Sequence, residues 1–444
     1  MAEYSVLQRR GPAFDAAAFA GAVADLEFAR ARVPFFRREG RGHGPARIDG
    51  PDDWARVPLT RRADYRADFP RGVLARGRTL GEPGTLVRGS GGVGGDRVTT
   101  AVRAGLLAAR RAVTLAAHPP LREAVLGGAS GRSARYTAPE CSGVECASPY
   151  TPVEQRTLAD GTLVLPSTPD PLAAPDALLA RAADELRAHA PAWLEADATA
   201  LAFLLRRLAA TGRDAAPPVG AIVLTHTPAT RVARRRIAEH RGPAVVAEAV
   251  TMSEFGWLAV ECPLGRTHLN NRSYFVEPLA GGGRPAAPGE LAELVVTSVG
   301  DRLSPHIRYR TGDLYRVWDD PCPCGSDLPV CHFEGRSGTL LTVPGRPAPI
   351  GAREVDRAVG DCPELDAYQV SQHREDEVRV EYVPNVKDTR ALEDGLVERL
   401  RALLGGRVRL TASAVRYLPA GPDGRLRPCV SDLPVRPLDQ EDPA

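Results

Sequence analysis

The spacing of apolar positions along the chain changes from one stretch to the next. Residues 13–31 repeat apolar side chains at helical spacing and predict an amphipathic helix, and a second alanine- and leucine-rich helix is expected near 101–117. Short apolar runs then alternate with helical segments, which favours a largely parallel sheet. In this stretch we expect strands at 160–166, 193–197 and 221–226, and helices at 171–190, 198–210 and 230–241.

After residue 242 the pattern becomes short β segments between Gly/Pro turns, which is typical of an antiparallel or barrel-like sheet. The last hundred residues form a separate α+β pattern, and the segment 335–345 is a plausible hinge. We therefore predict an α/β chain with a large N-terminal domain (1–337), containing parallel sheets and a barrel-like β part, and a small mobile α+β C-terminal domain (338–444). For the small domain we expect strands at 339–343, 366–372, 377–383 and 408–417, and helices at 351–359 and 388–404.

Composition narrows the class of protein. The 444 residues carry 57 basic and 55 acidic side chains, and this balance argues against binding nucleic acid or a membrane surface through a bulk basic field. The N-terminus has no apolar run behind a basic head, and no stretch approaches the length of a membrane span, so we expect a cytoplasmic protein. Lys387 is the only lysine, so any mechanism that needs an active-site lysine must use it.

Cysteine and histidine cluster in one part of the sequence. Cys322 and Cys324 form a tight C-x-C turn, while Cys262 and His268 lie upstream. Zinc prefers four tetrahedral nitrogen and sulfur ligands, so we predict one structural Zn²⁺ on these four residues, with Cys331 as the substitute ligand. The alternative is a set of buried, inert thiols. Cys141 and Cys146 have no assigned role.

Three further features suggest nucleotide chemistry, and each has a plainer alternative. The glycine-rich stretch 89–95 could let backbone N–H groups converge on a phosphate, or could be a flexible connector. Asp313 in a Tyr-Arg-Thr-Gly-Asp run suits ribose hydroxyls, but Gly-Asp pairs are also ordinary turns. Arg336 beside the hinge could clamp a ribose or phosphate, or could be a surface arginine.

Taken in order, these motifs resemble the adenylate-forming superfamily, specifically its phenylacetate–CoA ligase-like branch. The resemblance runs nearly end to end and is most specific at SPHIRYRTGDL (304–314). The other matching segments are VPFFR (33–37), WARVPLTRRADYRADF (54–69), GSGGVGG (89–95), Met252-Ser253-Glu254, CPCG (322–325), EGRS (334–337) and PDGRLRPCVSDL (422–433).

The resemblance implies an enzyme that converts ATP and a small or aromatic carboxylic acid into an acyl-adenylate. The small domain then rotates, and a thiol (CoA or a carrier protein) or an amine takes the acyl group, as in secondary metabolism. By the same resemblance Glu254 would hold Mg²⁺, and Arg425 stands where the family has its catalytic lysine. The expected ATP/AMP-binding residues are Ser90, Gly91 and Gly94 at the pyrophosphate, Ser253 near the α-phosphate, Asp313 at the ribose and Arg336 at the ribose–phosphate.

Several positions depart from the family pattern. Gly92, Val93 and Gly95 replace hydroxyl residues and a lysine of the phosphate loop, and Val250 stands where an aromatic residue usually covers the adenine. Arginine keeps the charge at position 425, but its planar fork does not reproduce a compact ammonium. These departures favour a second hypothesis, a divergent homologue that has lost adenylation and acts as an acyl-transfer or condensation enzyme or as a non-catalytic binding subunit.

Two histidines are expected in pocket loops. Thr225-His226-Thr227-Pro228 takes the place of the family's adenine loop, and His306 precedes the motif with Asp313. Either histidine could contact substrate or be structural. The acyl substrate, the acceptor and the choice between monomer and homodimer stay open.

Overall fold

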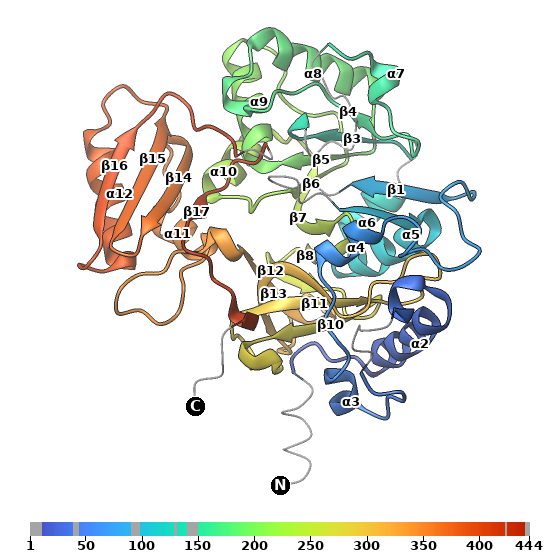
Figure 1. Cartoon of the computed structure of the whole chain (residues 1–444). Coiled ribbons are helices and arrows are strands. Elements are labelled where there is room, and N and C mark those ends of the chain that lie inside the picture. Colours follow the sequence, from blue (N-terminus) through green and yellow to red (C-terminus); the bar gives the residue numbers. More distant parts are fainter. Residues whose placement is uncertain are drawn as a thin grey trace. The chain divides into compact units, whose positions relative to one another are not determined.

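The computed structural model describes residues 11–38, 44–89, 98–127, 131–139, 150–421 and 424–439. The chain forms two compact units, each assembled from separate segments (Figure 1). Unit 1 consists of residues 1–119, 249–333 and 436–444, and unit 2 of residues 120–248 and 334–435. The domain boundary expected at 337/338 stays a prediction. No helix among the described residues is long and apolar enough to cross a membrane.

Unit 1 is built on an antiparallel sheet with strand order β10-β11-β12-β13-β9-β8, to which the end of β7 is added. Its core contains Phe255, Tyr274 and Tyr309, all fully buried. The hairpin of β1 and β2 flanks the glycine-rich stretch, of which residues 90–95 lie outside the described part together with residues 96 and 97. The elements are α2 (Ala16–Arg32), α3 (Pro51–Ala55), α4 (Arg62–Asp68), β1 (Thr85–Gly89), β2 (Thr99–Arg103), α5 (Ala104–Thr114), β7 (Val245–Met252), β8 (Gly256–Glu261), β9 (Thr267–Leu269), β10 (Tyr274–Leu279), β11 (Ala292–Ser298), β12 (Tyr309–Trp318) and β13 (Val330–Arg336).

Unit 2 contains two sheets. The first is parallel, with order β6-β5-β3-β4 beside the start of β7, and α8 and α9 bury their leucines against it. The second has the order β16-β15-β14-β17, and the apolar faces of α11 and α12 complete its core. The elements are α6 (Pro119–Leu126), β3 (Ser133–Tyr136), α7 (Val153–Arg156), β4 (Leu163–Val164), α8 (Asp176–His189), β5 (Trp193–Asp197), α9 (Ala198–Ala210), β6 (Ala221–Thr225), α10 (Arg231–His240), α11 (Ala352–Val359), β14 (Leu365–Arg374), β15 (Glu377–Pro384), α12 (Arg390–Leu404), β16 (Arg409–Ala414) and β17 (Cys429–Ser431).

The predicted α/β class is confirmed, with three local corrections. The helix expected from residue 101 begins at Ala104, because Thr99–Arg103 pairs with β1 as a strand. The strand expected at 339–343 is wrong: Leu341 makes only an isolated bridge to Ile350 after a 3-10 turn at Ser337–Thr339. The short strand β17 was not predicted.

Candidate functional site

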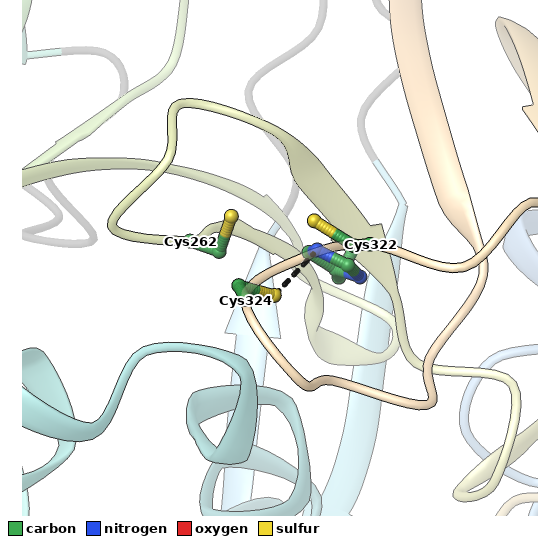
Figure 2. Close-up of side chains that lie close together, drawn as sticks. Cys262, Cys322 and Cys324 are labelled. Carbon is green, nitrogen blue, oxygen red and sulfur yellow. Dashed lines mark hydrogen bonds between the residues drawn. The ribbon is translucent and has the colours of Figure 1, made fainter.

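Four cysteine and histidine side chains meet in unit 1. The ligand atoms of Cys262, His268, Cys322 and Cys324 all lie within 4.8 Å of one another. Cys324 Sγ lies 3.4 Å from His268 Nε2, and Figure 2 shows Cys262 and Cys322 close to this contact, which is drawn as a dashed line. All three cysteines are free thiols. The structure thus brings together the four residues that the sequence predicted as metal ligands.

Two tight turns position these ligands. After β8, the N–H of Cys262 donates to Arg266 O and the N–H of Gly265 donates to Cys262 O, so the chain reverses directly into β9 and His268. In the second turn the N–H of Gly325, at φ 82°, donates to Cys322 O. That conformation favours glycine, and it sets Cys322 and Cys324 on one knuckle.

The surrounding contacts suit a metal. His268 Nδ1 lies 2.8 Å from Leu328 O, so Nδ1 carries the proton and donates, which leaves the Nε2 lone pair for a metal. The N–H of Ser326 lies 3.4 Å from Cys324 Sγ and can donate to a thiolate. Three sulfurs and one nitrogen match a structural zinc site with no position left for water. Cys331, the suggested substitute ligand, lies instead in the hydrophobic core of unit 1.

Glu254 lies in the turn between β7 and β8 and is 2% exposed. Its Oε1 accepts a 2.8 Å hydrogen bond from Tyr309 Oη and lies 3.5 Å from Arg62 Nη2. Burial, together with the Glu254 carboxylate, holds the pKa of Tyr309 well above its usual value. A carboxylate paired in this way differs from a magnesium ligand, since Mg²⁺ keeps several waters around it. Magnesium at Glu254 stays a prediction.

The neighbouring Ser253 lies next to the start of the glycine-rich stretch. Its Oγ donates a 3.0 Å hydrogen bond to the carbonyl of Gly89, the last residue of β1. The residues predicted at the pyrophosphate, Ser90, Gly91 and Gly94, lie outside the described residues. Ser253 is therefore bonded to the last described residue before this stretch.

Asp313 occupies a bulge in β12. Leu314 pairs with Glu293 and Arg310 with Val295, so three residues of β12 face one residue of β11. Gly312 adopts φ 72° there, and the Asp313 N–H donates to Thr311 Oγ1. Bulges of this kind redirect side chains at functional edges. Asp313 is buried, with an exposed fraction of 5%.

Arg336 and Arg425 belong to unit 2. Arg336 ends β13, where its N–H donates to Thr339 Oγ1 at 2.8 Å. Arg425 follows a turn in which the Gly421 N–H donates to Arg425 O, and Leu426 beside it is buried against Leu418.

Arg425 lies beside the C-terminal ends of the parallel strands of unit 2. It is close enough to Asp197 to lower the pKa of that carboxyl, although burial has the larger effect and raises the pKa. Burial lowers the pKa of the His226 imidazole, and Arg425 lies close enough to lower it further. Asp197 caps α9 by accepting from the N–H groups of Thr199 and Ala200, and it accepts from Thr227 Oγ1 at 2.6 Å.

The charged side chains of Arg135 and Glu195 lie close to His226. Glu195 of β5 lies directly opposite Arg135 of β3, and Arg135 Nη2 donates to Glu195 Oε2 at 3.0 Å. His226 Nε2 lies 3.5 Å from Glu195 Oε1. Sequence reasoning placed His226 in a pocket loop but missed Glu195 and Arg135. Charged residues inside otherwise apolar runs that predict parallel strands could have revealed them.

Known proteins resemble this chain in structure but not in sequence. No protein-family model matches the sequence, and no curated protein matches it in sequence. The structure resembles 2-hydroxyisobutyryl-CoA ligase in its postadenylation state in complex with 2-HIB-AMP (TM-score 0.67, 18% identity, 98% of this chain and 92% of that one). It also resembles a benzoate CoA ligase from Burkholderia xenovorans LB400 (TM-score 0.52, 13% identity, 79% and 70%). A third match is the anthranilate CoA ligase AuaEII in complex with anthranoyl-AMP (TM-score 0.51, 15% identity, 77% and 65%). The chain therefore has the fold of adenylate-forming ligases.

Proposed function

We propose that the chain uses ATP to activate a small or aromatic carboxylic acid as an acyl-adenylate and transfers the acyl group to a thiol or an amine. The observation that carries the proposal is the likeness over 98% of the chain to a ligase whose complex contains an acyl-adenylate. The ordered sequence motifs support it independently. Such an enzyme stabilises the charge on the phosphate with hydrogen-bond donors held in fixed positions. These donors account for a large share of the rate enhancement.

Within this proposal the residues of the chain have distinct roles. Asp313, on its bulge, would accept hydrogen bonds from ribose hydroxyls, and Arg336 would donate to the ribose–phosphate. Ser253 would lie near the α-phosphate, and Arg425 would face the carboxylate and α-phosphate in place of a lysine. Zinc on Cys262, His268, Cys322 and Cys324 would be structural. The pairing of Glu254 with Arg62 and Tyr309 does not suit Mg²⁺, which keeps several waters around it.

A second candidate function draws support from that same pairing. Because the Glu254 carboxylate is engaged by an arginine and a tyrosine, and because arginine replaces lysine at 425, the chain could take a preformed adenylate or thioester and carry out only acyl transfer. In that case free acid and ATP would not react at an ordinary rate.

Pyrophosphate exchange separates the two functions. We expect exchange of labelled pyrophosphate into ATP with at least one acid from a panel of benzoates, phenylacetates and short aliphatic acids. Arg425→Lys should raise the exchange rate by about tenfold or more, because a compact ammonium fits the developing charge better. Arg416→Lys, on an exposed arginine, is the matched control. Absence of exchange at high enzyme concentration, with no ATP or AMP binding by calorimetry, would contradict adenylation.

A further inference from the structure

The carboxyl ends of three parallel strands in unit 2 carry an unusual set of polar groups. Ser133–Tyr136, Trp193–Asp197 and Ala221–Thr225 run side by side in register, and His226 follows directly after the last of them (Figure 1). In open α/β sheets, ligands bind beyond the carboxyl ends of the strands. Charged side chains at this edge therefore lie where chemistry is expected.

Glu195 lies between Arg135 and His226 and contacts both side chains. Arg135 directs both Nε and Nη2 to the same oxygen, Glu195 Oε2, at 3.2 and 3.0 Å. The other oxygen, Oε1, lies 3.5 Å from His226 Nε2. The arginine thus fixes the carboxylate, and the carboxylate faces the imidazole. The side chains of Glu195 and His226 are 13% and 11% exposed, which limits competition from water.

The backbone of His226 is held in a conformation that favours glycine. Its φ is 74°, in the left-handed region that residues with a side chain seldom adopt. Strain of this kind persists where the surrounding structure enforces it, and it concentrates at functional sites. Glycine would occupy this position without strain. The position therefore combines an imidazole with a backbone conformation that favours glycine.

Burial is the main reason that the imidazole of His226 has a lowered pKa. Burial lowers the pKa of His226 to about 4, Glu195 acts in the opposite direction, and Arg425 and Arg135 lower the pKa further. The nearby Asp197 carboxylate is engaged by Thr227 and by the start of α9. With Nε2 turned to Glu195, Nδ1 is the nitrogen that can meet a ligand. If Arg425 binds a phosphate, the phosphate offsets its charge and the imidazole becomes more basic.

We propose that Glu195 and His226 form a proton-accepting pair for acyl transfer to an amine. This inference rests on the proposed function. The amine nitrogen attacks the acyl carbon, a C–N bond forms, and the bond between that carbon and the phosphate oxygen breaks. AMP leaves with the electron pair, and the surplus N–H proton passes to His226 Nδ1. Glu195 stabilises the resulting imidazolium, and the proton then returns to water.

The pair favours an amine over a thiol as acceptor. A thiol ionises near pH 8.5 by itself and attacks as a thiolate, so no proton remains on sulfur afterwards. An attacking neutral amine keeps a proton on nitrogen that must be removed. A fixed base therefore accelerates amide formation much more than thioester formation.

The test uses the full-length chain supplied with chemically prepared benzoyl-adenylate, so that adenylation is bypassed. Amide formation with propylamine is compared with thioester formation with CoA. His226→Gly should lower the amide rate by about 10²–10⁴-fold and the thioester rate by less than about tenfold. Free imidazole should restore part of the amide rate, which a purely structural role would not allow. Glu195→Gln should also reduce amide formation selectively.

Two controls keep the result interpretable. Glycine suits φ 74° at position 226, so His226→Gly should fold, and its thermal unfolding is measured in parallel. His373→Gln, on an exposed histidine, should leave both rates unchanged. The inference fails if wild-type protein forms no amide from the adenylate, or if His226→Gly forms it at the wild-type rate. Pyrophosphate exchange, measured separately, decides the proposed function whatever the transfer assay gives.

Discussion

The phenol of Tyr309 donates a 2.8 Å hydrogen bond to the carboxylate of Glu254, and both groups are buried in unit 1. The two residues lie far apart in the sequence. Tyr309 is the first residue of β12, and Glu254 lies in the turn after β7. The bond therefore joins the motif predicted to contact ribose to the motif predicted to contact the phosphates. Arg62 lies 3.5 Å from the same carboxylate oxygen.

This bond predicts the effect of removing one hydroxyl. Tyr309→Phe should destabilise the protein by about 1–3 kcal/mol, because the buried Glu254 carboxylate loses a donor that water cannot replace. The free energy of unfolding from urea titration measures the loss. Tyr417→Phe removes a hydroxyl from an exposed tyrosine and should change stability by less than about 0.5 kcal/mol. Equal stability of the two variants would show that the bond contributes nothing.

The cysteine–histidine cluster predicts a bound metal. Elemental analysis of the purified chain should give about one zinc per chain, and a strong chelator should lower the Tm as zinc leaves. Cys324→Ser should lose most of the zinc. Cys331→Ala should keep it, because Cys331 lies in the core and not in the cluster, even if it lowers stability. Less than a tenth of a zinc per chain in the wild-type protein would refute the site.

The buried imidazole of His226 predicts a pH dependence of stability. Its pKa is about 4 in the folded chain and about 6.5 when unfolded, so between these values the unfolded chain binds more protons. This histidine therefore costs stability as the pH falls from about 6.5 to 4, by up to about 1.4 kcal/mol per pH unit. It has no effect of this kind above pH 7.

The comparison of wild type with His226→Gly isolates this contribution. Asp25 has a pKa raised by burial to about 6 and acts in the opposite direction over part of the same range, but it is present in both proteins and cancels. The variant should lose less stability than wild type between pH 6.5 and 4 in urea titrations. Parallel curves for the two proteins would mean that His226 titrates normally.

The sequence predicted some elements to the residue and missed others for physical reasons. The strand Trp193–Asp197 and the helix Ala198–Ala210 match the expected bounds, because their apolar periodicity is strong and Asp197 is a good helix cap. The strand Cys429–Ser431 is too short to show periodicity, and it exists only through its pairing with Leu365–Arg374. Thr99–Arg103 adopts strand structure through its partner β1, which local propensity does not report.

The two candidate sites differ in the same way: one follows from local sequence, and the other depends on how distant strands pair. The grouping of Cys262, His268, Cys322 and Cys324 was predictable because closely spaced cysteines and histidines are typical of zinc sites. Glu195, Arg135 and His226 lie far apart in the sequence and meet only through the register of three parallel strands. Their proximity depends on strand order, which the sequence pattern alone does not give.

The segmented make-up of the two units has a consequence for how the protein can be divided. The chain passes from one unit to the other after residues 119, 248, 333 and 435. The last passage returns Leu438 to pack with Leu279 and Val295, and Asp439 to pair with Arg310 at 2.7 Å. No single cut in the backbone can therefore separate the units as independent fragments. Truncation before residue 436 would remove side chains that unit 1 needs, so fragment expression is a poor way to study either unit alone.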